Sequence, residues 1–153
     1  IGLRVLDYYL NAPPFDWLAG YTQRMARVDS MMAAENKATA AARDSLSKPS
    51  LPLARYAATY EDAWYGTVTV TMESGGLVMK FDKTPSLVGD MIHWQYDTWL
   101  VKWRDRELRA DAFVTFTLNE EGKVAGATMK PASPEVDFSF DFQDLDLRPV
   151  AKK

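Results

Sequence analysis

Three short strings in the sequence carry residue types that can form a serine-nucleophile site. Ser45 stands three residues before Lys48 in the string S-L-S-K, a spacing that places a hydroxyl and an amine on one helix face. The strings Y-L-N at residues 9–11 and K-T-P at residues 83–85 mimic the two that accompany such a pair. The likeness is weak, because Ser45 falls near the expected end of a helix and Pro85 replaces a glycine that would admit substrate. We therefore predict that the strings are coincidental and that this chain is not an enzyme.

Few other groups offer catalysis or metal binding. The chain has no cysteine, which removes disulfides, thiol nucleophiles and thiolate metal ligands. Its single histidine, His93, precedes Trp94 in a strand-like stretch and is interpreted as a structural or surface residue. The sequence predicts no catalytic residue, no metal site and no cofactor.

A set of aromatic residues is the best candidate for a binding site. If the strands that carry them close into a barrel with an open lumen, these rings can line a pocket for a small apolar ligand. An eight-stranded barrel either holds one small ligand or is filled by its own side chains. Large rings fill space well, so the sequence favours a packed core and leaves the ligand pocket as an alternative. The set consists of Trp64, Tyr65, Trp94, Tyr96, Trp99 and Trp103.

The composition is that of an ordinary globular protein. The chain has 153 residues, 47% of them hydrophobic and 25% charged, and a formal net charge of −3. Nucleic acid is not expected as a partner, since proteins that bind it carry clustered Lys and Arg. No apolar run approaches the ~20 residues that span a bilayer, and the start does not read as a signal peptide. Because the chain begins with Ile1 rather than Met, we expect that it was cut from a longer protein.

Helices are predicted at the N-terminus, and the second carries an apolar stripe. A short helix over residues 1–12 should stop before Pro13 and Pro14. A long helix follows, with Asp16 placed to cap its first turn, and the string S-K-P-S-L-P at residues 47–52 breaks it. Apolar residues recur along this helix at steps of three and four, which puts them on one face that needs a partner surface. We call them the helix stripe: Leu18, Tyr21, Met25, Val28 and Met32.

After Pro52 the pattern changes to the alternation of strands with one buried face. Alternating segments include residues 67–72, 77–81, 114–118 and 138–142, separated by turns or loops. They add up to about seven or eight strands without the crossovers of a parallel sheet, which indicates an antiparallel up-and-down barrel. The sequence thus predicts an α+β chain, with a helical segment at residues 1–50 and a single barrel over residues 51–153.

One stretch breaks the alternation. A first set of apolar residues shares one parity, and a second set shortly after it shares the other. A side-chain period of two cannot place both sets on one face unless the pairing register shifts. We therefore predict a β-bulge or a sharp bend near Asp97 and Thr98. The two sets are Ile92, Trp94 and Tyr96, then Trp99, Val101 and Trp103.

Three longer strings carry a resemblance to a known family. They read LARYAATYEDAWYGTVTV, GGLVMKFDKTPSLVGDMIHWQYDTW and RADAFVTFTLNEEGKVAGATMKPASPEVDFSFDFQDL. Together they resemble a C-terminal domain of unknown function that follows the catalytic domain in bacterial serine hydrolases of the β-lactamase class C and penicillin-binding type. The resemblance implies a lipocalin-like barrel and a periplasmic or secreted parent protein. Residues 3–21 are similar to the closing helix of the hydrolase domain and its linker, which implies that the catalytic residues lie upstream.

Two hypotheses on function follow from the residues and the resemblance. The first is a non-catalytic accessory domain that packs on its serine hydrolase, or self-associates, through the helix stripe. The alternative is a lipocalin-like binder of a small apolar ligand in the barrel. A third hypothesis, an independent enzyme acting through Ser45, is the least favoured.

Overall fold

The computed structural model describes residues 2–13, 15–134 and 136–150, and the chain divides into two units, one up to Ala42 and one from Arg43. The first unit holds helices α1 (Gly2–Tyr9) and α2 (Trp17–Ala41). Asp16 caps α2, because its carboxylate accepts hydrogen bonds from two amides of the first turn at 3.1 Å. The two predicted helices and the cap are confirmed.

Side chains at the start of α2 connect it to α1. The indole N–H of Trp17 donates to the carboxylate of Asp7, and the ring of Phe15 packs edge-on against Trp17 with 4.9 Å between centroids. No described residue of either helix is buried. Within the described ranges, neither helix combines the length and apolarity that a bilayer crossing requires.

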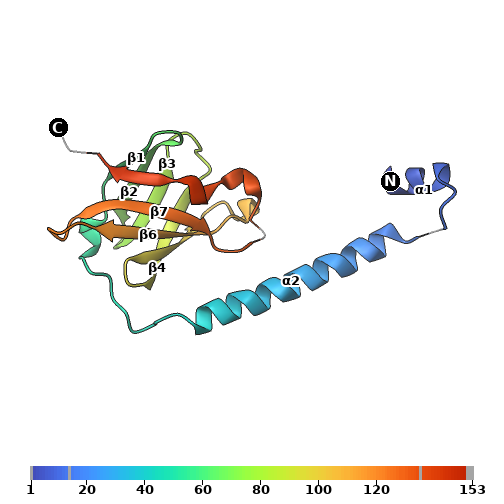
Figure 1. Ribbon diagram of the computed structural model, residues 1–153, viewed down its shortest axis with the longest axis horizontal. Helices are drawn as coiled ribbons and strands as arrows, with labels where there is room; N and C mark the ends of the chain where they lie inside the picture. Colours follow the sequence, from blue (N-terminus) through green and yellow to red (C-terminus); the bar gives the residue numbers. More distant parts are fainter. Residues whose placement is uncertain (1, 14, 135, 151–153) are drawn as a thin grey trace. The chain divides into compact units, whose positions relative to one another are not determined.

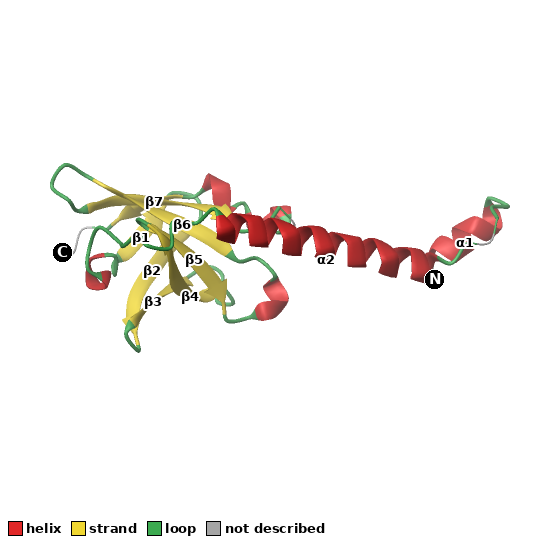
Figure 2. Ribbon diagram, turned by 90° about the horizontal axis from the view of Figure 1, so that it is seen from below, coloured by secondary structure: helices red, strands yellow, loops and turns green. Residues whose placement is uncertain are grey.

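The second unit is a closed barrel of eight antiparallel strands (Figure 1, Figure 2). Each strand pairs with its neighbours in chain order, and β8 closes the barrel by pairing with β1. The predicted up-and-down barrel is therefore confirmed. The strands are β1 (Thr59–Asp62), β2 (Gly66–Glu73), β3 (Gly76–Phe81), β4 (Val88–Gln95), β5 (Thr98–Trp103), β6 (Ala112–Leu118), β7 (Val124–Pro131) and β8 (Asp146–Pro149).

Because consecutive strands run in opposite directions, their connections alternate between the two ends of the barrel. One end carries the connections at residues 63–65, 82–87, 104–111 and 132–145, and we call it the long-loop end. The other end carries the turns at residues 74–75, 96–97 and 119–123 together with the segment 43–58 that leads into β1. We call it the hairpin end.

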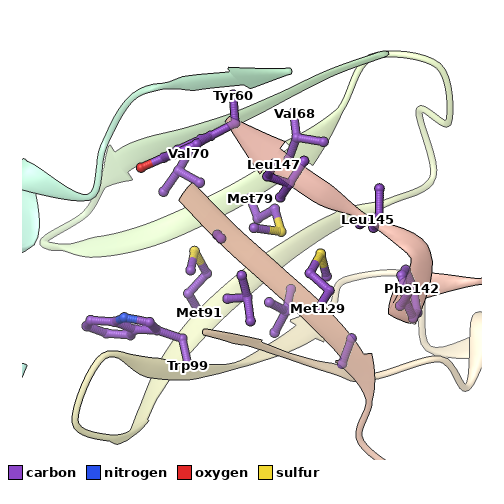
Figure 3. Close-up of a cluster of buried hydrophobic side chains, with 14 of the residues drawn as sticks. Tyr60, Val68, Val70, Met79, Met91, Trp99, Met129, Phe142, Leu145 and Leu147 are labelled. Atoms are coloured by element: carbon purple, nitrogen blue, oxygen red, sulfur yellow. The ribbon is translucent and has the colours of Figure 1, made fainter. Parts of the chain in front are cut away.

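Inward-facing side chains fill the barrel. Val68 and Val70 of β2 are buried in the interior and alternate with partly exposed threonines, as expected for a strand with one buried face. Figure 3 shows Met79, Met91 and Met129 among the interior side chains, and these three are at most 6% exposed. Because the interior is occupied by the chain's own side chains, the barrel has a packed hydrophobic core.

The predicted break in alternation is a hairpin with a bulge. The register of β4 and β5 shifts between His93 and Gln95, and the chain reverses at residues 96–97, where Tyr96 has a φ of 48°. The bulge lies slightly before the predicted position, and the sharp bend lies at it. Together they allow Trp99, Val101 and Trp103 to face the interior while Ile92, on the other strand, is 47% exposed.

One strand prediction is wrong. The stretch at residues 138–142 forms parts of two short 3-10 helices, η3 (Phe138–Phe140) and η4 (Phe142–Asp144). The amide of Phe140 donates to the carbonyl oxygen of Asp137 at 3.0 Å, and the carboxylate of Asp137 accepts from the amide of Ser139 at 2.8 Å. Aspartate side chains that bind nearby amides favour such turns over a strand, although the apolar residues alternate.

Candidate functional site

A buried carboxylate fixes the turn between β1 and β2 at the long-loop end. Asp62 is 6% exposed, and one of its oxygens accepts hydrogen bonds from the amides of Trp64 and Tyr65 at 2.8 Å. The other oxygen accepts from the amide of Asp146, at the start of β8, at 2.9 Å. Burial raises the pKa of Asp62, but the three backbone donors outweigh it and hold this pKa below its ordinary value. The turn that carries Trp64 and Tyr65 is therefore firmly held.

A pocket of about 310 Å³ lies beside this turn. Its walls come from the β1–β2 turn, the β3–β4 loop and the segment of η3 and η4. Trp64 is 89% exposed, whereas Leu87 and Phe142 are buried. The described lining residues are Trp64, Tyr65, Phe81, Lys83, Thr84, Leu87, Ser139, Phe140, Phe142 and Leu145.

The pocket's aromatic wall continues into the barrel core. Phe140 stacks on Phe142 with 5.6 Å between centroids, and Phe142 stacks on Trp103 at 6.0 Å. Phe81 meets Trp103 edge-on at 5.9 Å. Trp103 is 1% exposed and donates its indole N–H to the carbonyl oxygen of Ala110 at 2.6 Å. We interpret the pocket as a surface cup over a filled barrel.

Polar groups give the pocket an uneven charge. Among the described lining residues Lys83 alone carries a charge, and its stem runs along Gly66, where an added Cβ would lie 3.2 Å from the Lys83 Cγ. Burial raises the pKa of the Tyr65 phenol, and the carboxylates of Asp141 and Asp144 raise it further. The phenol therefore stays protonated and can donate a hydrogen bond. Apolar rings, one cation and hydroxyl groups form a set suited to binding a small molecule.

A second carboxylate organises the hairpin end. Asp97 accepts hydrogen bonds from the Ser50 amide at 2.9 Å, from the Ser50 hydroxyl at 2.8 Å, and from the Tyr56 hydroxyl. Burial raises the pKa of Asp97, but the Tyr56 and Ser50 donors more than offset it, so this pKa is lowered. Burial and the bond to Asp97 raise the pKa of Tyr56 to about 12.

Aromatic rings lie next to these polar groups. Tyr56 packs against Phe116 with 5.1 Å between centroids and against Trp99 at 5.7 Å. Tyr60 also meets Phe116, and its hydroxyl donates to the Tyr56 carbonyl oxygen at 2.7 Å. Trp99 is 3% exposed, and its indole nitrogen has no hydrogen-bond partner in the part of the chain that the structure describes.

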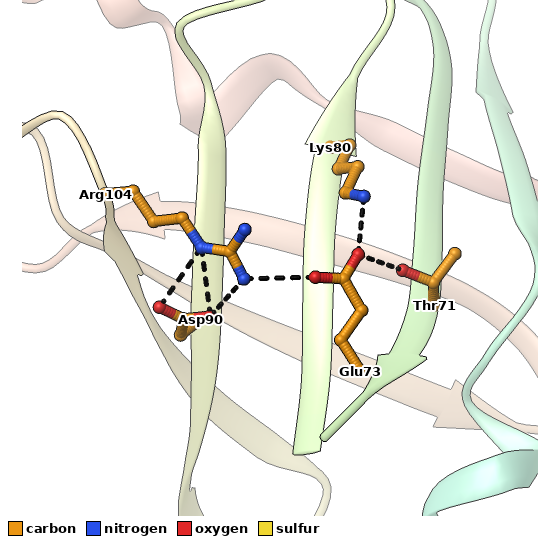
Figure 4. A network of polar contacts seen from close by, with 5 residues as sticks. All are labelled: Thr71, Glu73, Lys80, Asp90 and Arg104. Atoms are coloured by element: carbon orange, nitrogen blue, oxygen red, sulfur yellow. Dashed lines mark hydrogen bonds and ion pairs between the residues drawn. The ribbon is translucent and has the colours of Figure 1, made fainter. Parts of the chain in front are cut away.

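The outer wall of the barrel carries a network of ion pairs (Figure 4). Glu73 on β2 binds Lys80 on β3 at 2.5 Å and Arg104 at 3.1 Å, and Arg104 also binds Asp90 on β4 at 2.8 Å. Hydrogen bonds from Lys80 and Arg104 lower the pKa of Glu73. All four side chains are a third or more exposed, so solvent screens these pairs. The network lies on the outer surface of the strands.

The six aromatic residues singled out in the sequence are not gathered at one place. Trp99 and Trp103 are buried in the barrel interior, 3% and 1% exposed. Trp64 and Tyr65 line the pocket at the long-loop end. The core and the pocket thus take two residues each.

The other two aromatics lie near the hairpin end and away from the pocket. The ring of Trp94 packs against Phe113 with 5.0 Å between centroids, and the guanidinium of Arg43 lies over it at 5.1 Å. Tyr96, in the β4–β5 turn, is 58% exposed and donates its hydroxyl proton to Asp44 at 3.0 Å. These contacts tie the segment after α2 to the β4–β5 hairpin, and α2 ends at Ala41, before the break predicted from the sequence.

The helix stripe is at the surface of α2. Leu18 and Tyr21 are 76% and 65% exposed. Met25, Val28 and Met32 are partly exposed, and no described residue of the helix is buried.

The strings that mimic a serine site do not come together within the barrel unit. Ser45 and Lys48 are exposed and belong to the segment at the hairpin end. Lys83 and Thr84 line the pocket at the opposite end. The string at residues 9–11 belongs to the helical unit.

Sequence reasoning missed most of the pocket's residues. The alternation of Phe140 and Phe142 with polar residues predicts a strand, while Phe81 and Leu87 look like ordinary core residues flanking a loop. The spacing of Asp137 before Ser139 signals a side-chain-capped turn and was the available cue. Lys83 gave no cue in the sequence beyond its place in K-T-P.

Comparisons with known proteins identify the barrel unit. The sequence model of a family described as a domain of unknown function, DUF3471, matches residues 42–149. Among solved structures, one match is the C-terminal domain of penicillin-binding protein Rv0907, with 20% sequence identity and a TM-score of 0.48 over 68% of this chain and 88% of that chain. No curated protein matches. The family match confirms the resemblance noted from the sequence, and the chain belongs to the DUF3471 family.

Proposed function

We propose that the chain is a non-catalytic accessory domain of a bacterial serine hydrolase of the β-lactamase and penicillin-binding type, acting in the periplasm or outside the cell. In this proposal the tail of the hydrolase domain and its linker lie within residues 1–50, and the barrel over residues 51–153 is the accessory part. The membership of residues 42–149 in DUF3471 and the resemblance of residues 3–21 to a hydrolase's closing helix support it.

The exposed apolar surface of the helical unit carries this proposal. Several large apolar side chains of this unit are at least half exposed. Helices that bury so little surface are only marginally stable in water. Apolar surface of this extent marks an interaction site. We infer that the catalytic domain covers it, because the resemblance makes α1 part of that domain. The side chains are Leu3, Leu6, Tyr8, Tyr9, Leu10, Leu18 and Tyr21.

A binding measurement tests the proposal. The coding sequence upstream of Ile1 is expected to supply S-x-x-K, Y-x-N and K-T-G strings, and the domain it encodes should bind this chain in a calorimetric titration. Leu6→Asp and Leu18→Asp should each weaken binding by roughly tenfold or more, since they place a charge in an apolar interface. Gln23→Asp, on the opposite face of α2, is the matched control and should leave the affinity unchanged.

Two results would contradict the proposal. One is an upstream coding sequence without these strings. The other is a dimer of this chain in light scattering that Leu18→Asp dissociates, because a second copy would then cover the helix stripe in place of the hydrolase.

The other hypothesis from the sequence places a ligand inside the barrel. Trp99 and Trp103 occupy that interior together with Met79 and Met129, and all four are at most 4% exposed. Because these side chains fill the lumen, they favour the accessory-domain hypothesis over a carrier that holds its ligand inside the barrel.

A further inference from the structure

The pocket at the long-loop end has no role in the proposed docking of the helical unit, and its walls are fixed before any ligand arrives. The Asp62 carboxylate holds the turn with Trp64 and Tyr65 through amide hydrogen bonds of 2.8 Å. On the facing side, Phe142 is 2% exposed and stacked on Trp103. A ligand therefore does not need to order these groups, which lowers the cost of binding.

The shape and surface of the pocket specify the body of the ligand. Its volume of about 310 Å³ is at the small end of the range for small-molecule sites. Five aromatic side chains line it, and rings stack best on flat partners. Trp64 is 89% exposed and therefore presents an apolar ring surface that a ligand can cover. The body is therefore a small, flat, apolar group.

Lys83 specifies the ligand's charge. No described residue forms an ion pair with Lys83, and no acidic residue is among the described lining residues. The neighbouring Asp82 directs a carboxylate oxygen to the amide of Thr67 at 3.2 Å. The carboxylates of Asp141 and Asp144 lie close enough to Tyr65 to raise its pKa, so their negative charge falls on the Tyr65 side of the pocket. An anionic group thus finds its counter-charge at Lys83, with the lining hydroxyls of Thr84 and Ser139 as further donors.

We propose that this pocket binds a small organic anion, with its flat apolar body among Trp64, Tyr65 and Phe140 and its acidic group at Lys83. The site is separate from the barrel lumen, because stacked rings lie between the two. Its described lining residues all belong to the barrel unit, whereas the helix stripe belongs to the helical unit, so its test does not depend on the accessory function.

A pair of dyes with one ring system tests both halves of the proposal. 8-Anilinonaphthalene-1-sulfonate has a flat apolar body and an anion, and N-phenyl-1-naphthylamine has the same body without the charge. Fluorescence titration of the full chain should give tighter binding of the sulfonate. Lys83→Gln should weaken the sulfonate by roughly three- to tenfold and leave the neutral dye unchanged. Lys48→Gln, which removes an exposed positive charge at the hairpin end, should change neither.

Variants of the rings locate the dyes. Trp64→Ala and Phe140→Leu should weaken both dyes by roughly three- to tenfold, since a stacked ring is lost from each. Tyr8→Ala, which removes a ring that is 82% exposed in the helical unit, is the matched control and should have no effect. The indole signal of Trp64 in a ¹H–¹⁵N spectrum, assigned by its loss in Trp64→Phe, should shift on binding.

Three outcomes would overturn the proposal. The first is no saturable binding of either dye. The second is binding weakened by Tyr8→Ala and unaffected by Trp64→Ala, which would place the dyes on the helical unit. The third is an equal response of the two dyes to Lys83→Gln, which would show that the pocket does not select for charge. Melting curves of Phe140→Leu and Lys83→Gln that match the wild type exclude loss of fold as the cause.

Discussion

At each end of the barrel a partly or fully buried carboxylate accepts hydrogen bonds from a distant part of the chain, Asp97 at the hairpin end and Asp62 at the long-loop end. Asp97 binds Ser50, which is 47 residues away, and Asp62 binds the amide of Asp146, which is 84 residues away. Both carboxylates have lowered pKa values, because their donors outweigh the effect of burial. Asp97 joins its end of the barrel to the segment before β1, which belongs to no strand. Asp62 adds a contact to the start of β8, which the strand ladder already pairs with β7.

What lies beyond each carboxylate differs. At the hairpin end Arg43, Asp44 and Ser47 bind the β4–β5 turn and its flanking residues. At the long-loop end the two short helices η3 and η4 contribute rings and leave a pocket of about 310 Å³. A barrel with a filled interior can therefore still offer a binding surface at one end. Here the hydrogen-bonded segment before β1 covers the hairpin end, whereas aromatic side chains line a pocket at the long-loop end.

The largest effect is expected where the pocket meets the core. Trp103→Ala removes the ring that stacks on Phe142 and leaves the Ala110 carbonyl oxygen without its indole donor. We expect a loss of ~3–5 kcal/mol in the free energy of unfolding, measured by urea denaturation. Trp64→Ala, at the exposed rim, should stay within ~0.5 kcal/mol of the wild type. Similar losses for the two variants would mean that the pocket and the core are one structure.

Asparagine in place of either carboxylate compares the two ends directly. Asp62→Asn and Asp97→Asn keep the shape but supply only one acceptor oxygen, and each should lower the free energy of unfolding by ~2 kcal/mol at neutral pH. Chemical denaturation of both variants gives the comparison. A much smaller loss at one end would show that its carboxylate is not what holds it.

The same two carboxylates predict the behaviour in acid. Their folded-state pKa values lie below those of an unfolded chain, which are about 3.9 for Asp. Their contribution is therefore complete above about pH 5 and is lost as the pH falls through about 4 and on through the folded pKa. Unfolding curves between neutral pH and pH 3 should show this loss in the wild type and a shallower one in Asp62→Asn and Asp97→Asn. An unchanged slope in both variants would contradict the prediction.

The two buried tryptophans provide a finer comparison of the ends. Trp103→Phe loses a hydrogen bond to Ala110, whereas Trp99→Phe removes an indole nitrogen that has no partner among the described residues. We expect Trp103→Phe to be more costly than Trp99→Phe by ~1 kcal/mol, since an unpaired carbonyl oxygen remains. Equal costs in parallel urea titrations would mean that the Trp99 indole has an unseen partner, such as a water molecule.

The barrel was predictable from the sequence because its strands have one buried face. Val68 and Val70 alternate with threonines, and the Gly75 turn has the positive φ of 85° that its position requires. The parity change between Trp94 and Trp99 gave the irregular hairpin to within a few residues. Local periodicity decided all of these features.

The pocket was not predictable, because it depends on contacts between loops far apart in the sequence. In the sequence, Phe140 and Trp64 look like ordinary core aromatics. Only the closed barrel brings them together at the pocket of the long-loop end. Asp62 looks like a solvated strand residue until β8 supplies the amide of Asp146. Residues of this kind gain their role from topology, which periodicity does not encode.

The smallest effect is expected on the wall between the ends. Glu73→Gln removes the charge that Lys80 and Arg104 share, but all of these side chains are solvated and the network spans neighbouring strands that are already paired. The melting temperature of Glu73→Gln should therefore differ from that of the wild type by no more than about 1 °C. Added salt should have little effect on the melting temperature of the wild type. Differential scanning calorimetry at low and high ionic strength measures both. If Glu73→Gln lowered the melting temperature as much as Asp62→Asn does, the electrostatic contacts that stabilise the barrel would lie on its wall and not at its two ends.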